Sequence, residues 1–299
     1  MLDIVILTDH RYVNPEKVDW YTQQVLDEDR LLQTALENNG LTVCKKDWAD
    51  KNFDWTSSKY AIFRTTWDYF ERFDEFFIWL EDTKKKTTFI NSSEIIIWNI
   101  DKHYLQDLAK NKVNIAPTLF VEKGDRITLA QLFDKANWKE AVLKPAISGA
   151  ARQTYRIHPN NCSEFETLFQ KLIENESMLF QEFLNNIITQ GEISLILIGG
   201  KYTHAVKKIA KKGDFRVQDD HGGRVEKYTP TKEEILFAEN CLIASPFKPK
   251  YARVDIVYDN NNKPSLSELE LIEPELWFRN YPLAAEKLAE EISNLVISK

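Results

Sequence analysis

The stretch Tyr251–Phe278, YARVDIVYDNNNKPSLSELELIEPELWF, has the pattern of two strands joined by a turn. Successive side chains of a strand point to opposite faces. Arg253 and Asp255 therefore share one face of the first strand, and Glu268 and Glu270 share one face of the second. The polar, proline-containing run between the strands has turn composition. Pairing them as a hairpin brings Asp255, Glu268 and Glu270 together.

Three carboxylates in one place repel each other, and burying them without a partner costs free energy. A divalent cation relieves that conflict. An all-oxygen ligand set with no nearby histidine or cysteine suits Mg²⁺, with Mn²⁺ as the alternative. The sequence thus predicts a metal site formed by Asp255, Glu268 and Glu270. The competing interpretation is a solvated strand face that carries ordinary charges.

Composition narrows the classes of protein that the chain can represent. Its 299 residues predict one large domain or two to three small ones. A net charge of −7 argues against a general nucleic-acid or anionic-membrane surface. Because no apolar run is long enough to span a bilayer and the N-terminus lacks a secretory signal, we expect a cytoplasmic protein. The three cysteines are widely spaced and form no metal pattern.

Apolar runs and amphipathic segments alternate over about the first hundred residues. We expect strands at 2–7, 41–45, 60–63 and 88–91, and helices at 27–38 and 73–83. This alternation predicts a small doubly wound α/β domain. Arg64, at the end of the third strand, is a candidate anchor for a substrate carboxylate, and Trp67, Asp68 and Tyr69 can shape a pocket beside it. The alternative is a surface turn with a packed tryptophan.

Two loops beyond an expected joint at residues 92–100 have compositions that suit binding. Lys144 ends a strand and precedes the small-residue loop Ser148–Ala151. Small side chains let backbone N–H groups approach phosphate oxygens, and a lysine adds positive charge. P-loop spacing is absent, so a plain hairpin is the alternative. The charged run Lys211–Arg224, which contains Gly213, Gly222 and Gly223, has no core pattern and suits a lid or a binding loop.

The order of these features resembles the ATP-grasp superfamily, in particular the glutathione synthetase-like and ribosomal S6-modification-type ligases. The features that carry the resemblance are, in chain order, Lys102, Lys144-Pro145 with its small-residue loop, Gln181-Glu182-Phe183-Leu184, Asp214-Phe215-Arg216, Gly222-Gly223, Asp255 and Glu268-Leu269-Glu270. Four segments look most like the subgroup that contains the cyclo-ligase of cycloserine biosynthesis. These segments are 64–69, 203–207, 213–218 and 268–276.

The resemblance implies an ATP-grasp fold of mixed α/β (α+β) class, with a small N-terminal domain and two α+β subdomains that clasp the nucleotide. We place these parts at residues 1–97, 98–182 and 183–299. The implied activity is an ATP- and Mg²⁺-dependent carboxylate–amine ligase that acts through an acyl phosphate on a small amino-acid-like or peptide substrate, either between molecules or as an intramolecular cyclo-ligase. A small-molecule kinase and a regulatory nucleotide-binding module without turnover remain alternatives. Members of the family often form homodimers.

The resemblance also assigns roles to residues. The nucleotide-binding set is Lys102, Lys144, Gln181, Glu182, Phe183, Leu184, Glu192 and Lys207. Within it, the two first lysines meet the phosphates, residues 181–184 hold adenine, and Glu192 binds the ribose hydroxyls. The catalytic set is Arg216, Lys144 and Arg253, and the substrate-binding set is Arg64, Asp68, Gln218, Gly222 and Gly223. Three positions depart from the usual family pattern: Glu270 and Gln218 each stand where relatives often have Asn, and the phosphate loop has fewer glycines than usual.

Overall fold

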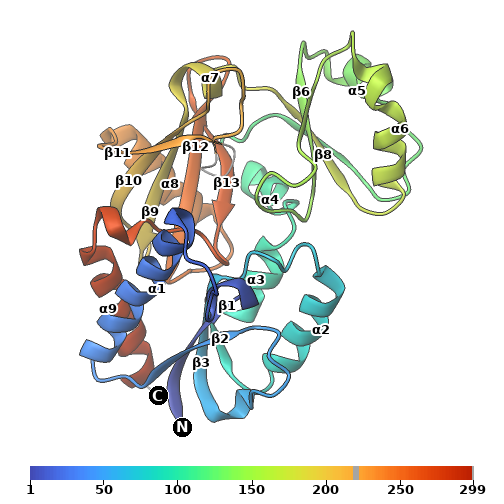
Figure 1. The fold of residues 1–299 in the computed structure, drawn as a ribbon. Coiled ribbons are helices and arrows are strands. Elements are labelled where there is room, and N and C mark those ends of the chain that lie inside the picture. The colour runs from blue at the N-terminus through green and yellow to red at the C-terminus, as the bar shows by residue number, and fades with distance from the viewer. Residues whose placement is uncertain (218–221, 298–299) are drawn as a thin grey trace.

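The structure, a computed structural model, describes residues 1–217 and 222–297. Within these residues the strands form three sheets (Figure 1). The mixed α/β class predicted from the sequence is confirmed. The described helices include none that is both long enough and apolar enough to cross a membrane.

The first sheet is parallel and has the strand order β2-β1-β3-β4. Its strands are β1 (Leu2–Thr8), β2 (Val43–Asp47), β3 (Ser58–Thr65) and β4 (Thr88–Ile90). The helices of this part are α1 (Trp20–Asn38), α2 (Phe73–Thr83) and α3 (Ser93–Asn99), with 3-10 turns η1 (His10–Tyr12) and η2 (Trp55–Ser57). Residues Ile4 to Leu7 are fully buried, as expected for a central parallel strand.

Two sequence expectations for this domain need correction. Helix α1 begins at Trp20, seven residues before the predicted start, because the Asp19 side chain caps it by accepting the Thr22 N–H at 2.7 Å. The expected joint at 92–100 is mostly helix α3. Its buried Ile95 and Ile96 pack into two different cores, so tertiary contacts select the helix.

The second sheet is antiparallel and has the order β5-β8-β6-β7. Its strands are β5 (Thr118–Val121), β6 (Ala141–Pro145), β7 (Tyr155–Ile157) and β8 (Met178–Glu182). Helices α5 (Leu129–Ala136) and α6 (Cys162–Ile173) pack on it, and α4 (Tyr104–Lys110) precedes it. This middle part has a hydrophobic core of its own and stands apart from the other two sheets (Figure 1).

The third sheet is antiparallel and has the order β11-β10-β9-β12-β13. Its strands are β9 (Glu192–Ile198), β10 (Lys201–Ile209), β11 (Arg224–Tyr228), β12 (Tyr251–Tyr258) and β13 (Pro264–Glu270). The remaining elements are α7 (Asn186–Gln190), α8 (Lys232–Ala244), η4 (Phe278–Asn280) and α9 (Leu283–Ile297). The central hairpin predicted from the sequence is thus confirmed as β12 and β13.

The last helix ties the two ends of the chain together. Helix α9 lies beside α1 (Figure 1), and both contribute to one core that also contains Ile4 of β1 and Ile196 of β9. The first and third sheets therefore share a hydrophobic core. The middle part has a core of its own and also contributes Leu179 of β8 and Ala146 to a second core of the third sheet.

Candidate active site

The hairpin brings the predicted acids together. In the β12–β13 register, Arg253 lies opposite Glu270 and Asp255 lies opposite Glu268. The register shifts by one residue after Asp255, next to Ser267. Such a bulge puts an extra residue into one strand, so Leu266 can face the core although its parity differs from that of Leu269. Because of this bulge, the acids lie on one face of the hairpin and the apolar side chains on the other, on both sides of Ser267.

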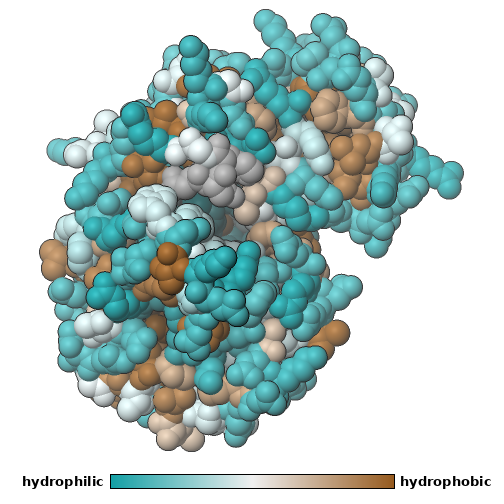
Figure 2. All heavy atoms as spheres, in the orientation of Figure 1, coloured by the Kyte–Doolittle hydropathy of each residue, from teal (hydrophilic) through white to brown (hydrophobic). Residues whose placement is uncertain are grey.

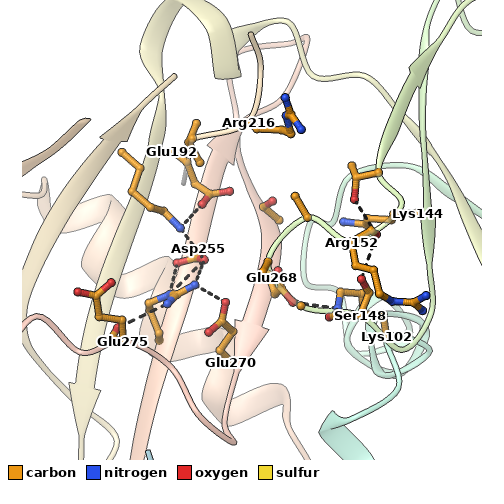
Figure 3. A pocket seen from close by; sticks show the side chains of 18 of the residues that line it. Lys102, Lys144, Ser148, Arg152, Glu192, Arg216, Asp255, Glu268, Glu270 and Glu275 are labelled. Carbon is orange, nitrogen blue, oxygen red and sulfur yellow. Dashed lines mark hydrogen bonds and ion pairs between the residues drawn. The ribbon is translucent and has the colours of Figure 1, made fainter. Parts of the chain in front are cut away.

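Cations from neighbouring strands compensate these acids (Figure 3). Arg253 donates to Asp255 at 2.9 and 3.0 Å and also pairs with Glu270. Lys208 of β10 donates to Asp255 at 3.0 Å and pairs with Glu192 of β9.

Lys102 reaches the same hairpin from the joint between the sheets. Its ammonium lies 3.1 Å from a carboxylate oxygen of Glu268 and also donates to the carbonyl of Ser148. Lys102 thereby connects the acidic hairpin to the phosphate loop.

The crowding perturbs the acids unequally. Burial raises the pKa of Glu270 to about 8; Arg253 opposes this shift, and the carboxylates of Glu268 and Asp255 add to it. Burial alone would also raise the pKa of Asp255, but Arg253 and Lys208 hold it below its usual range. For Glu268, Lys102 and Lys144 outweigh burial and lower the pKa. One carboxyl group with a raised pKa beside two with lowered pKa values is typical of carboxylates that share a site.

The donor set fits a hard divalent cation by its chemistry. Asp255, Glu268 and Glu270 supply only carboxylate oxygens and come from directly facing positions of one hairpin. Within the described ranges, however, no three His, Cys, Asp or Glu side chains are arranged as a metal cage. The three carboxylates point instead at Arg253, Lys208 and Lys102. Binding a cation therefore requires these side chains to turn away from their present partners.

A cavity of about 650 Å³ lies over the hairpin and is lined by residues from all three parts of the chain. The space-filling view shows the surface hollowed where the middle part meets the rest (Figure 2). Many of the predicted site residues line it: Lys102, Lys144, Gln181, Glu182, Phe183, Leu184, Glu192, Arg216, Arg253, Asp255, Glu268 and Glu270. Residues far apart in the sequence are thus collected in one volume that can hold a nucleotide and a small substrate.

The middle part contributes a wall that suits a nucleotide. Residues 181–184 follow β8 into the cavity, and the backbone N–H of Leu184 makes no hydrogen bond to another described residue. Lys144, at the end of β6, forms no ion pair within the described ranges. Burial lowers its pKa, because desolvation penalises the ammonium. A partly buried lysine that forms no ion pair with a described residue is a favourable counter-charge for a phosphate.

The phosphate loop adopts a strained backbone. Ala150 and Ala151 have φ values of 48° and 53°, in the left-handed region that non-glycine residues rarely adopt. A Cβ atom at Gly149 would lie 2.5 Å from Phe70 of the first domain, so only glycine fits at this contact. The loop thus packs against the first domain over the cavity. Arg216 lines the cavity from the opposite side and donates to Asp214 at 2.8 Å.

The sequence resemblance assigns Lys207 to the nucleotide site, but in the structure the neighbouring Lys208 lies at the cavity. Lys207 does not line the cavity, and its ammonium lies over the Tyr228 ring at 5.6 Å on the other face of β10. Lys208 lines the cavity instead and is buried. Strand periodicity contains the signal for this correction, because Lys208 lies opposite Glu192 in the β9–β10 register and must share its face.

Most predicted substrate-binding residues also lie elsewhere. Arg64 is 1% exposed, donates to Glu28 and to the carbonyl of Pro274, both at 2.9 Å, and does not line the cavity. Asp68 is buried and accepts from Trp48 Nε1 at 2.7 Å. It does not line the cavity either.

The glycine-rich segment contributes little to the cavity wall. Gly222 lies in an exposed turn with φ of 77°, and neither it nor Gly223 is among the lining residues. Gln218 lies outside the described residues. The neighbours Phe215, Arg216 and Val217 do line the cavity.

An aromatic wall completes the cavity on the side of the first domain. Tyr12, Tyr21, Trp67 and Tyr69 line it together with Glu273. The sequence pointed to Trp67 and Tyr69 as pocket residues but gave no signal for Tyr12 and Tyr21. These two come from η1 and α1, and only the fold brings them to Trp67.

Comparison with known proteins gives matches over most of the chain. The family model described as the N-terminal domain of D-cycloserine synthetase DcsG matches residues 4–91. The model described as the ATP-grasp domain of prokaryotic glutathione synthetase matches residues 106–247. Cycloserine biosynthesis protein DcsG of Streptomyces lavendulae is 27% identical over 259 residues, which cover 82% of this chain and 86% of that protein.

Solved structures with a similar fold include two ligases. The crystal structure of D-cycloserine synthetase DcsG gives a TM-score of 0.86 at 24% identity and covers 98% of this chain and 99% of that one. D-alanine–D-alanine ligase from Bacillus anthracis gives 0.66 at 15% identity and covers 100% of this chain and 98% of that one. These matches confirm the resemblance that the ordered motifs predict.

Proposed function

Because the chain is an ATP-grasp carbon–nitrogen ligase, we propose that it joins a carboxylate to an amine of a small amino-acid-like or peptide substrate through an acyl-phosphate intermediate. Such ligases use ATP and a divalent metal. The observation that carries the proposal is the cavity in which Glu268 of the β12–β13 hairpin lies near Lys102 and Lys144. We also propose that the chain divides at residues 97 and 182 into the parts described above.

The proposed reaction needs no nucleophile from the protein. A carboxylate is a poor electrophile, because its leaving group would be an oxide. Attack of the substrate carboxylate oxygen on the γ-phosphorus releases ADP and makes the acyl carbon reactive. The amine nitrogen then attacks that carbon, the amide bond forms, and phosphate leaves while the amine loses a proton. The protein contributes position and charge compensation.

The residues of the chain divide these tasks. We assign the nucleotide phosphates to Lys102 and Lys144, and the transferred phosphoryl group to Arg216 and Arg253. Asp255, Glu268 and Glu270 would hold Mg²⁺, which neutralises phosphate charge when bound. The phosphate loop, packed on Phe70, excludes water that would hydrolyse the intermediate.

Lys208 is an addition to the predicted set. It pairs with Asp255 and Glu192 at once. If Asp255 held Mg²⁺, the Lys208 ammonium would lose one of its two partners, and we therefore assign Lys208 to the nucleotide site in place of Lys207.

We propose an intramolecular cyclo-ligase as the more specific form of the activity. It is supported by the match of residues 4–91 to the N-terminal domain of D-cycloserine synthetase and by the similarity over the whole length of the chain. A cyclo-ligase takes one molecule that contains both the carboxylate and the amine, so no second substrate has to bind.

The test is ATP turnover with Mg²⁺ against a panel of amino acids, dipeptides and diamino acids, with ADP release and product mass read together. One diagnostic probe is 2,4-diaminobutyrate, since its γ-amine and carboxylate can close a five-membered lactam. ADP release with a product lighter than the substrate by one water supports the cyclo-ligase. A condensed two-molecule product supports the intermolecular ligase, and a phosphorylated product without an amide refutes both.

A further inference from the structure

Among the cavity acids of residues 255–275, one has no ion pair in the part of the chain that the structure describes. Glu273 follows the metal-site hairpin by three residues and lines the cavity, and within the described ranges it forms no ion pair. The other cavity acids of that segment are paired: Asp255 and Glu270 with Arg253, Glu268 with Lys102, and Glu275 with Arg279. Glu71 and Glu182, from other segments, also line the cavity without an ion pair to a described residue. A partly buried carboxylate without a counter-charge is costly unless a ligand supplies one.

The surroundings of Glu273 hold its carboxylate in place. The Tyr69 hydroxyl hydrogen-bonds to it, and Trp67 Nε1 donates to its backbone carbonyl at 2.9 Å. Burial raises the pKa of Glu273 to about 7; the Tyr69 hydrogen bond and the charge of Lys102, which is paired with Glu268, oppose that shift. A bound cation would favour the ionised form and reverse the shift.

Aromatic rings extend from this carboxylate across the wall of the cavity. The Trp67 ring packs edge-on against Tyr12, with ring centres 5.8 Å apart, and lies 6.4 Å from Tyr21. Both tyrosines line the cavity with Trp67. Arg11 already lies over the Tyr12 ring at 5.5 Å, so Tyr12 supports the Trp67 ring in this wall. A carboxylate beside aromatic rings is an environment that attracts an ammonium group, through charge pairing and cation–π contact together.

We propose that this wall, formed by Glu273, Tyr69, Trp67, Tyr12 and Tyr21, binds the protonated amine of an amino-acid substrate. The inference rests on the proposed ligase function and narrows its substrate class. The bound ammonium is a recognition group and is distinct from the nitrogen that attacks the acyl carbon, because a protonated amine has no lone pair for that attack. The substrate therefore contains an ammonium group in addition to the reacting carboxylate and amine.

A matched pair of probes isolates that ammonium. 2,4-Diaminobutyrate and 4-aminobutyrate both contain a carboxylate and a γ-amine, and they differ only in the α-amine. Calorimetric titration of the full chain with each probe, with and without ADP and Mg²⁺, gives the two dissociation constants. We expect at least one enantiomer of 2,4-diaminobutyrate to bind roughly ten- to hundredfold more tightly than 4-aminobutyrate. This range corresponds to the contribution of one charged hydrogen bond.

Two variants test the role of Glu273. Glu273→Gln keeps the size and the Tyr69 contact but removes the charge, and should abolish the preference for the diamino acid while leaving ATP affinity unchanged. Glu71→Gln is the control, since Glu71 is an exposed acid at the edge of the same cavity. It should retain the preference. Where turnover is measurable, Glu273→Gln should raise KM for the diamino acid more than it lowers kcat.

The outcomes separate the two proposals. Failure of the wild type to bind ATP refutes the ligase proposal, and titration of the nucleotide-free chain still decides the amine site. ATP binding with equal affinity for the two probes, or with neither bound, overturns the amine site and leaves the ligase proposal standing. A preference that persists in Glu273→Gln also overturns it.

Discussion

Two buried arginines, Arg64 and Arg253, look alike in the sequence and differ in the structure. Each stands in a strand, and the sequence assigned both to the substrate or the reaction. Arg253 pairs with Asp255 and Glu270 and lines the cavity. Arg64 pairs with Glu28 and lies outside the cavity. The comparison shows that the position of a buried arginine relative to a cavity, and not its burial, separates a site residue from a structural one.

The partners of Arg64 explain what it does. Glu28 of α1 accepts its guanidinium and also accepts the backbone N–H groups of Leu276 and Phe278 at 2.6 and 3.2 Å. Arg64 itself donates to the Pro274 carbonyl. This pair therefore holds the segment 274–278, next to Glu273, against the first domain. Its effect on the active site is indirect, through the position of that segment.

The largest expected effect is the loss of stability in Arg64→Met. Removing Arg64 leaves the buried Glu28 carboxylate with only the longer Arg279 contact at 4.0 Å, and breaking a buried pair typically costs about 3–5 kcal/mol. We expect the midpoint of urea unfolding to fall accordingly. The double variant Arg64→Met/Glu28→Gln should recover part of the loss, because no unpaired charge remains. If Arg64→Met were as stable as the wild type but bound substrate poorly, Arg64 would be a substrate-binding residue after all.

Next in size is a loss of turnover without a loss of fold in Glu268→Gln. Glu268→Gln removes the pair with the buried Lys102 at 3.1 Å but also relieves the repulsion between Glu268 and Glu270, so the two effects oppose each other and the protein should stay folded. Mg²⁺-dependent turnover should fall by roughly a hundredfold or more, as expected for loss of a metal ligand. Unfolding curves and ADP release measured on one preparation check both parts. If Glu268→Gln kept the turnover of the wild type, Glu268 would not be a metal ligand.

These contrasts define what the sequence could predict. The hairpin, its turn and the meeting of its three acids follow from period-two alternation, and all are present in the structure. Helix α3 and the short strand β7 escaped prediction because tertiary packing and not local pattern selects them. Arg64 was assigned to a ligand because its partner, Glu28, is 36 residues away and no local pattern links them. Of the aromatic wall, the sequence predicted Trp67 and Tyr69 but not Tyr12 and Tyr21, because no local pattern links these two tyrosines to Trp67.

A smaller effect is expected from pH, through a histidine that supports the same segment. His204 Nε2 lies 2.8 Å from the Leu276 carbonyl, and burial lowers the pKa of this histidine to about 4. Below an unfolded-state pKa of about 6.5, the unfolded chain takes up a proton that the folded chain excludes. Stability due to His204 is therefore complete above pH 6.5 and decreases as the pH falls toward 4.

The variant His204→Gln isolates this contribution. Glutamine can still donate to the Leu276 carbonyl but does not titrate. Between pH 7 and pH 5 the wild type should lose about 2 kcal/mol more stability than the variant. Urea unfolding at the two pH values measures the difference. Parallel pH dependence in the two proteins would show that His204 is not held neutral by burial.

The smallest expected effect comes from two adjacent lysines, and it tests the comparison within a single strand. Lys208 and Lys207 differ by one position in β10 and therefore point to opposite faces. Lys208 contacts Glu192 and Asp255 in the cavity, whereas Lys207 lies over Tyr228 outside it. Lys208→Met should raise KM for ATP roughly tenfold, the size of one charged contact. Lys207→Met should leave KM within about twofold, since Lys207 lies outside the cavity. The reverse result would mean that β10 presents its other face to the nucleotide, and the register of β10 against β9 would then be off by one residue.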